Sequence, residues 1–260
     1  MIRVGIGGWN FAPWRGTFYP AGLKHDDELK YASSKLTSIE INGTFYRTQT
    51  PASYAKWRDE TPDGFVFSVK GHRAVTNKRV LGEAGEAIDW FLKSGVTELG
   101  DKLGPLLWQM MPFKKFDADD FGAFLALLPE KAGGLKLRHV VEVRHPTFLV
   151  PQFVALLRQH NVAVVYADSD DYPAMADVSA GFIYARLQRS QEKLDLGYPP
   201  AELDLWAARM KTWAGGGEPD DLPRVANDRA KKAKRDVFVY VIAGDKVRAP
   251  AAAQALIARV

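Results

Sequence analysis

The sequence predicts a single (β/α)₈ barrel that occupies residues 1–260. Short segments rich in β-branched and aromatic residues alternate with helical patterns, which indicates repeated βα units and a parallel sheet. Eight such units fill the 260 residues, a length typical of this barrel, and leave no segment over. An open doubly wound sheet would show the same alternation. A closed barrel is favoured over the open sheet because eight units use the whole chain and no Gly/Ser- or Pro-rich linker divides it.

Each expected strand is short, and most are followed by a helical segment. The strands are expected at Arg3–Gly7, Ser38–Ile41, Phe65–Lys70, Leu106–Met110, Val140–Arg144, Ala163–Asp168, Phe182–Leu187 and Val237–Ile242. The helices are expected at Asp27–Ser34, Pro51–Glu60, Gly85–Leu99, Ala118–Leu128, Val150–His160, Ala201–Trp213 and Pro250–Arg259. The Asp-rich stretch from Asp168 to Gly181 is expected to be a loop. Residues 215–235 are expected to form a surface αβ loop before the eighth strand.

The amino-acid composition excludes several kinds of functional site. The absence of cysteine excludes disulfides, thiolate nucleophiles, iron–sulfur clusters and Cys-based zinc sites. A net charge of +4 and a pI of about 9.1 permit an anionic partner without requiring one. The first residues do not resemble a signal peptide, and no apolar run approaches the roughly 18 residues of a membrane span. A cytoplasmic protein without a membrane partner is therefore expected.

The loop after the first strand is unusually rich in aromatic residues. It contains Trp9 and Trp14, with Arg15 beside the second tryptophan. In this fold the βα loops lie at the C-terminal end of the barrel, where binding sites form. The loop is therefore expected either to plug the barrel as a packed lid or to offer a stacking surface for a base or sugar ring, with Arg15 available to an anion.

Polar and charged side chains end six of the predicted strands. Alternation places Glu40 and Asn42 on one face of the second strand. Across the strand ends, three acids are expected to meet three bases in a formally neutral cluster: Glu40, Glu142, Asp168, Lys70, Arg144 and Arg186. The cluster is either a mutually satisfied structural ring or a binding site, and both interpretations stay open. Gln109 and Tyr46 are expected beside it.

Several of these residues occur in motifs that resemble a known family. The motifs are Gly7-Gly8-Trp9, Trp14-Arg15-Gly16 with Phe18-Tyr19-Pro20, Glu40-Ile41-Asn42 with Thr44-Phe45-Tyr46-Arg47, Leu103-Gly104-Pro105 with Gln109, and Glu142-Val143-Arg144-His145-Pro146. Together they resemble the YecE-like family, also called domain of unknown function seventy-two. The resemblance implies a TIM barrel whose motifs line its top, and it implies no settled activity. Members have been likened in fold to apurinic endonucleases and sugar isomerases, which is a weak guide to chemistry. The chain departs from the family pattern at Ile242-Ala243-Gly244-Asp245.

Three kinds of catalysis fit the predicted mouth. One divalent metal ion would be held by Glu142 and Asp168, with Glu40 and His145 available as further ligands. His145 is either a ligand or proton carrier, or part of a turn before Pro146. Glycosidase chemistry would use two of the three carboxylates. Schiff-base chemistry would use Lys70, but adjacent acids are expected to keep its ammonium protonated.

The working hypothesis is a hydrolase or isomerase that acts on a sugar-phosphate, a nucleotide or a nucleic-acid-derived ligand. Glu142 and Asp168 would act as acid and base or hold the metal. The anion would be bound by Arg144, Arg186 and Lys70, and Trp9 and Trp14 would stack on the ring. A phosphate site is also considered at Gly244, Lys246 and Arg248, before the last helix. The alternative is a non-catalytic module that binds nucleic acid or another ligand, in which the charged ring is structural and nucleic acid is bound by the aromatic first loop or the basic stretch 229–235.

Overall fold

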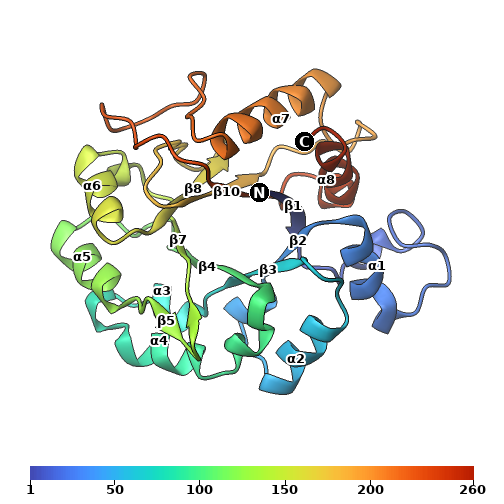
Figure 1. The fold of residues 1–260 in the computed structure, drawn as a ribbon, viewed down its shortest axis with the longest axis horizontal. Coiled ribbons are helices and arrows are strands. Elements are labelled where there is room, and N and C mark those ends of the chain that lie inside the picture. The colour runs from blue at the N-terminus through green and yellow to red at the C-terminus, as the bar shows by residue number, and fades with distance from the viewer.

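The computed structural model describes all 260 residues and contains a closed barrel of eight parallel strands (Figure 1). The strands are β1 (Ile2–Gly7), β2 (Ser38–Ile41), β3 (Val66–Lys70), β4 (Leu103–Gln109), β7 (His139–Glu142), β8 (Ala163–Asp168), β9 (Phe182–Leu187) and β10 (Asp236–Val241). The last strand closes the barrel by pairing with β1. The predicted fold class is confirmed, and every expected strand is present with its bounds shifted by three residues at most.

Helices surround the strands on the outside of the barrel (Figure 1). They are α1 (Glu28–Lys35), α2 (Pro51–Asp59), α3 (Arg73–Thr76), α4 (Gly85–Leu92), α5 (Ala118–Leu127), α6 (Pro151–Gln159), α7 (Pro200–Ala214) and α8 (Ala249–Ile257). Local sequence sets several of their starts. The side chains of Thr50 and Asp117 accept hydrogen bonds from first-turn amides of α2 and α5, and Pro51 and Pro151 supply a preset φ.

The helix expected over Gly85–Leu99 is shorter in the structure than the sequence predicted. Helix α4 ends at Leu92, and a separate 3-10 segment follows at Val96–Lys102. Gly95 between them adopts a φ of 105°, which ends the helical path. A Cβ atom at Gly95 would lie 2.6 Å from the Cα atom of Pro51, so the close approach to α2 also requires glycine. The sequence also did not predict the short hairpin of β5 (Lys131–Ala132) and β6 (Leu135–Lys136), which precedes β7.

The barrel wall separates two hydrophobic clusters. The larger one joins the outer faces of the strands to the helices. The smaller one fills the interior with side chains from alternate positions of the strands, including the rings of Tyr184 and Tyr240, whose centres lie 5.0 Å apart. Gly5 of β1 makes room for this packing, because a Cβ atom there would lie 2.0 Å from the carbonyl oxygen of Ser38. Inward positions further along each strand therefore reach the C-terminal mouth of the barrel.

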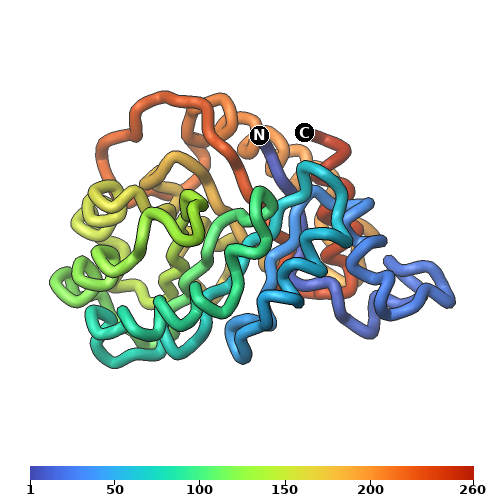
Figure 2. The backbone as a smooth tube through the Cα atoms, turned by 60° about the horizontal axis from the view of Figure 1, so that its bottom comes forward, coloured from blue at the N-terminus to red at the C-terminus, as the bar shows by residue number.

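The long connection of residues 215–235 joins the end of α7 to the start of β10, on the N-terminal side of the barrel. It is the orange-red tube at the top of Figure 2. Residues 169–181, between β8 and β9, contain no helix, in agreement with the sequence. None of the helices has the length and apolar character that would be needed to cross a membrane.

Candidate active site at the barrel mouth

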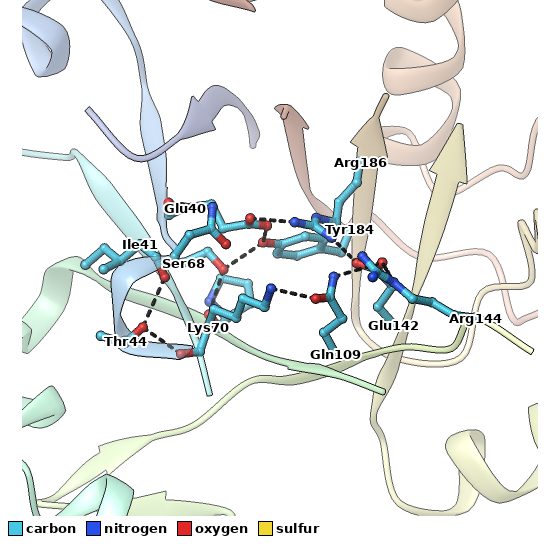
Figure 3. A network of polar contacts seen from close by, with 12 residues as sticks. Glu40, Ile41, Thr44, Ser68, Lys70, Gln109, Glu142, Arg144, Tyr184 and Arg186 are labelled. Carbon is cyan, nitrogen blue, oxygen red and sulfur yellow. Dashed lines mark hydrogen bonds and ion pairs between the residues drawn. The ribbon is translucent and has the colours of Figure 1, made fainter. Parts of the chain in front are cut away.

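Inward-facing polar side chains from five strands meet at the C-terminal end of the barrel (Figure 3). Lys70 ends β3, Gln109 ends β4 and Glu142 ends β7, whereas Glu40 and Arg186 are the next-to-last residues of β2 and β9. All five are buried, and Glu40 is fully shielded from solvent. The alternation of inward and outward residues along each strand places them at the mouth, as the sequence predicted for these five side chains.

Arg186 lies at the centre of the cluster and joins its two carboxylates. Its Nη2 atom donates to Oε1 of Glu40 at 3.0 Å, and its Nη1 atom donates to Oε2 of Glu142. Burial acts to lower the pKa of Arg186, but Glu142 and Glu40 outweigh it and raise the pKa above its ordinary value. The guanidinium is therefore permanently charged and committed to these two acids.

Tyr184 completes the coordination of Glu40. Its hydroxyl donates to Oε2 of Glu40 at 2.5 Å, and Oγ of Ser68 lies 2.8 Å from the same hydroxyl. Burial, followed by the negative charge of Glu40, raises the pKa of Tyr184 well above its usual range, so the phenol stays protonated. Sequence reasoning did not select Tyr184 or Ser68. The signal was present, because both residues precede an inward-facing cation, Arg186 or Lys70, by two positions.

Glu142 is held by three donors. Nε of Arg144 donates to its Oε1 atom at 2.8 Å, Nε2 of Gln109 donates to the same atom at 3.1 Å, and Arg186 occupies Oε2. Burial alone would raise the pKa of Glu142, but Arg186 and then Arg144 lower it to about 2. Glu142 is therefore ionised at neutral pH and unsuited to act as a general acid.

Lys70 contacts Gln109 and an aromatic ring. Its Nζ atom donates to Oε1 of Gln109 at 2.6 Å and lies 4.2 Å from the centre of the Phe45 ring. Burial, and next the positive charge of Arg186, lower the pKa of Lys70 to about 8. Glu40 and Glu142 act to raise this pKa, as expected of neighbouring acids, but desolvation and Arg186 outweigh them, so Lys70 releases its proton more readily than an exposed lysine.

Asp168 does not join this cluster, so the predicted meeting of three acids with three bases is wrong. Strand register explains the difference: Asp168 pairs with Leu187, whereas Arg186 pairs with Ala167. Paired residues of neighbouring strands share a face, and Leu187 packs in the outer cluster, so Asp168 points outward. Its Oδ1 atom lies 3.4 Å from Arg189, and burial raises its pKa to about 6. The remaining five charges, including Arg144, give the inner cluster a net charge of +1.

The arrangement does not fit the expected metal site. Glu142 and Asp168 lie on opposite faces of the barrel wall, and both oxygen atoms of Glu142 already accept hydrogen bonds from protein donors. No group of three or more His, Asp or Glu side chains in the protein could hold a metal ion. His145 lies outside the cluster, where its Nδ1 atom accepts from the Thr147 amide and caps the 3-10 turn Pro146–Phe148.

A family comparison agrees with this architecture. The family model described as "Protein of unknown function DUF72" matches residues 3–260. The chain belongs to the DUF72 family. It is 26% identical to the UPF0759 protein YunF of Bacillus subtilis over 59% of this chain and 54% of YunF. It is also 26% identical to the UPF0759 protein YecE of Escherichia coli K12 over 57% of this chain and 50% of YecE. The match thus spans about half the length of each of these two relatives.

A solved DUF72 structure from Thermotoga maritima is similar over nearly the whole chain. The TM-score is 0.72 at 20% sequence identity, with 99% of this chain and 97% of that chain covered. Structural similarity at this level of sequence identity supports a shared fold and carries no information about activity. The DUF72 assignment therefore agrees with the predicted family and barrel, and the chemistry has to be argued from the site.

In this DUF72 protein Trp14 is a packing residue, which corrects its expected role in stacking on a ligand. Its side chain is fully buried, packs against Phe11 and Tyr19, and donates from Nε1 to the carbonyl oxygen of Lys246 at 2.8 Å. No face of this ring is open to a ligand. Arg15 is half-exposed and pairs with the buried Glu28 at 2.6 Å, which leaves it engaged rather than free for an anion.

Trp9 is placed differently and lines a cavity of about 300 Å³ at the ends of β1 and β2. The ring of Trp57, which also lines the cavity, packs edge-on against Trp9. Asn42 contributes a buried Oδ1 atom that has no hydrogen-bond partner. Lys246 closes another side. The first loop of this DUF72 chain is thus a packed lid around Trp14 and a cavity wall at Trp9.

Two further expectations concern the rim. Tyr46 is 67% exposed, and Arg73 lies over its ring at 5.9 Å. In the loop considered for phosphate, Nζ of Lys246 lies 4.6 Å from the centre of the Phe11 ring, and Arg248 donates to the carbonyl oxygen of Glu192. Asp245 caps the short turn that follows by accepting from the amide of Val247. The phosphate site in this loop stays a prediction.

Proposed function

We propose that this protein is an enzyme that binds a small anionic ligand of the sugar-phosphate or nucleotide kind at the barrel mouth, where Lys70 transfers a proton. The observation that carries the proposal is the net charge of +1 in the buried cluster, since one cationic charge there has no protein counter-ion. A desolvated charge without a partner is costly, and an anionic ligand would remove that cost.

Unused donors remain on Lys70 and Arg144, and Nε of Arg186 also has no hydrogen-bond partner. The Lys70 ammonium has three N–H groups, and one of them is bonded to Gln109. Arg144 uses Nε for Glu142 and stacks over the ring of Tyr172 at 4.2 Å, which leaves its two terminal nitrogens free. Arg186, in contrast, is committed to both acids. An anionic group would therefore bind between Lys70 and Arg144.

Proton transfer by Lys70 favours isomerisation over hydrolysis. A base acts best when its pKa lies near the working pH, and the pKa of Lys70 is about 8 whereas that of Glu142 is about 2. Hydrolysis of a glycosidic bond would need one carboxylic acid that still holds its proton. Glu142 does not meet this requirement, and Glu40 accepts from both Arg186 and Tyr184. A neutral Lys70 could instead remove a proton from a carbon next to a carbonyl group.

The cavity at Trp9 supports a ligand with a ring. A sugar or base could stack on the indole, and the unpartnered Oδ1 of Asn42 would accept from a hydroxyl or amino group. Asn42 follows Glu40 by two residues and so continues the inward face of β2 toward the mouth.

Binding of ribose 5-phosphate and AMP, measured by calorimetry at fixed ionic strength, tests the proposal. We expect Lys70→Met and Arg144→Gln each to weaken binding at least tenfold, and the exposed control Lys93→Met to leave it unchanged. Proton exchange of ribose 5-phosphate in D₂O, followed by NMR, would report the chemical step and should disappear in Lys70→Met. If neither compound binds, or if the three variants bind alike, the proposed site is wrong.

A non-catalytic nucleic-acid module is the second candidate, and the rim of the mouth favours it. Tyr46 and Phe113 are 67% and 74% exposed, and Lys78 and Lys115 line a cavity of about 430 Å³ together with Phe113. Exposed rings among cations are typical of surfaces that bind single strands. Under this candidate, a short oligonucleotide would bind with a steep salt dependence and Phe113→Ser would weaken it, without any exchange reaction.

A further inference from the structure

A second basic cavity lies at the opposite end of the barrel from the mouth. It has a volume of about 400 Å³ and is lined by the connection before β10, by α6 and by the residues that precede β9. Five of its lining residues are cations, and one is an acid: Arg158, Arg229, Lys231, Lys234, Arg235 and Asp228. The basic stretch of the sequence therefore borders an open concave site as well as exposing charge to solvent.

Two of the five cations have partners. Arg158 pairs with Asp228 at 2.7 Å, and Arg229 pairs with Asp220. Lys231, Lys234 and Arg235 form no ion pair with any carboxylate of the protein. Three positive charges thus remain uncompensated around one cavity.

Arg235 is the unusual member of this group. It is 5% exposed, and its only side-chain hydrogen bond runs from Nη2 to the carbonyl oxygen of Lys231 at 2.7 Å, while Nη1 has no partner. Glu218 is the carboxylate that raises the pKa of Arg235 through its charge, but it accepts a hydrogen bond from the amide of Ala230 and lies 3.8 Å from Arg224. Glu218 is therefore shared with these two groups, and the buried guanidinium of Arg235 lacks the close counter-ion that such groups normally have.

We propose that this cavity is a second anion site, separate from the barrel mouth, and that it binds a small compound with several linked phosphate groups. Three unpaired cations match the charge of such a compound, and a planar guanidinium binds phosphate oxygens through two parallel hydrogen bonds. The cavity is an open hollow of about 400 Å³ bordered by Arg158 of α6, Gly181 before β9 and residues 228–235, and a volume of this size fits a small ligand whose phosphates reach all three cations.

Calorimetric titration of the whole protein with sodium tripolyphosphate, at ionic strength kept constant with NaCl, tests this site. We expect saturable binding that falls at least tenfold in the double variant Lys231→Ala, Lys234→Ala. The matched control is Lys131→Ala, Lys136→Ala, which removes two exposed lysines from the hairpin of β5 and β6 at the same end of the barrel. Lys70→Met should leave unchanged the part of the binding that depends on Lys231 and Lys234. The proposal is overturned if the wild type does not bind, or if the control loses as much affinity as the test variant.

Replacement of Arg235 separates a ligand role from a structural one. Arg235→Met should weaken tripolyphosphate at least tenfold and leave the melting temperature of the free protein unchanged or higher, because it removes an unpaired buried charge. Unchanged affinity in a folded Arg235→Met protein would overturn the role of Arg235. If this variant does not fold, the double lysine variant tests the site in its place.

Binding of a 12-nucleotide single strand is measured under the same conditions. Tighter binding of that strand than of tripolyphosphate, with the same dependence on Lys231 and Lys234, would overturn the small ligand in favour of a nucleic-acid surface.

Discussion

Arg186 acts on Lys70 across the barrel interior: after burial, its guanidinium is the strongest influence that lowers the pKa of Lys70, to about 8. The two side chains enter from β9 and β3 and do not touch the same carboxylate. Arg186 neutralises both acids of the cluster, so these acids compensate Lys70 only in part. The same arrangement therefore produces an ionised Glu142 and a lysine that titrates near neutral pH.

The first prediction concerns the stability that Lys70 contributes at different pH values. Because its folded pKa lies below the ordinary 10.5, the unfolded chain binds more protons than the folded protein between pH 8 and 10.5. The contribution of Lys70 to the free energy of unfolding should therefore rise with pH across this window, by up to about 3 kcal/mol for a shift of this size. Buried tyrosines such as Tyr184, whose pKa is raised, act in the opposite direction in every variant, so the measured quantity is a difference. Urea unfolding at both pH values should show a change with pH that is more positive in the wild type and in the exposed control Lys93→Met than in Lys70→Met. Equal slopes in all three proteins would contradict it.

The second prediction concerns the carboxylate of Glu142. Glu142→Gln leaves Arg144 without a counter-ion and Arg186 with Glu40 as its single acidic partner, so we expect a loss of about 3–5 kcal/mol in the free energy of unfolding at pH 7. Because the folded pKa is lowered to about 2, this contribution is complete above the ordinary pKa of 4.5 and is lost as the pH falls toward 2. The difference from wild type should therefore shrink by about 2 kcal/mol at pH 3. Exposed Glu86→Gln is the control, and a difference that stays constant between pH 7 and pH 3 would show that ionisation of Glu142 is not its source.

The third prediction distinguishes the two tryptophans of the first loop. Trp14→Ala removes a fully buried indole and should cost about 3–5 kcal/mol in urea unfolding. Trp9 is partly exposed at its cavity, so Trp9→Ala should cost less and should instead weaken AMP binding. The reverse pattern, with a larger stability loss at Trp9 and a binding loss at a folded Trp14 variant, would contradict these assignments.

The sequence was a good guide to the inner face of the barrel because alternation is a local property of a strand. Once Ser38–Ile41 and Phe182–Leu187 were assigned as strands, Glu40 and Arg186 belonged near the C-terminal ends of their elements. Parallel strands bring these ends to one rim, and the structure places both residues there with an ion pair between them.

The same reasoning failed at Asp168, which follows Tyr166 just as Arg186 follows Tyr184. Alternation along a strand indicates that two residues lie on the same face of the sheet, but it does not indicate whether that face points into the barrel or out of it. Register against β9 decides this, because Tyr166 pairs with Ala185 and packs outward against Trp206 of α7. The expected neutral cluster thereby became a cluster with a net charge of +1.

By itself, the sequence determined the order and bounds of the strands, the barrel, the family and the five polar residues that end its inner faces. These features depend on periodicity and motifs within single segments. Tertiary structure alone decided that Trp14 is sealed while Trp9 lines a cavity, that Lys70 has a lowered pKa, and that Arg235 is buried without a counter-ion. Those properties depend on distances between segments far apart in the chain, because burial and charge act through space.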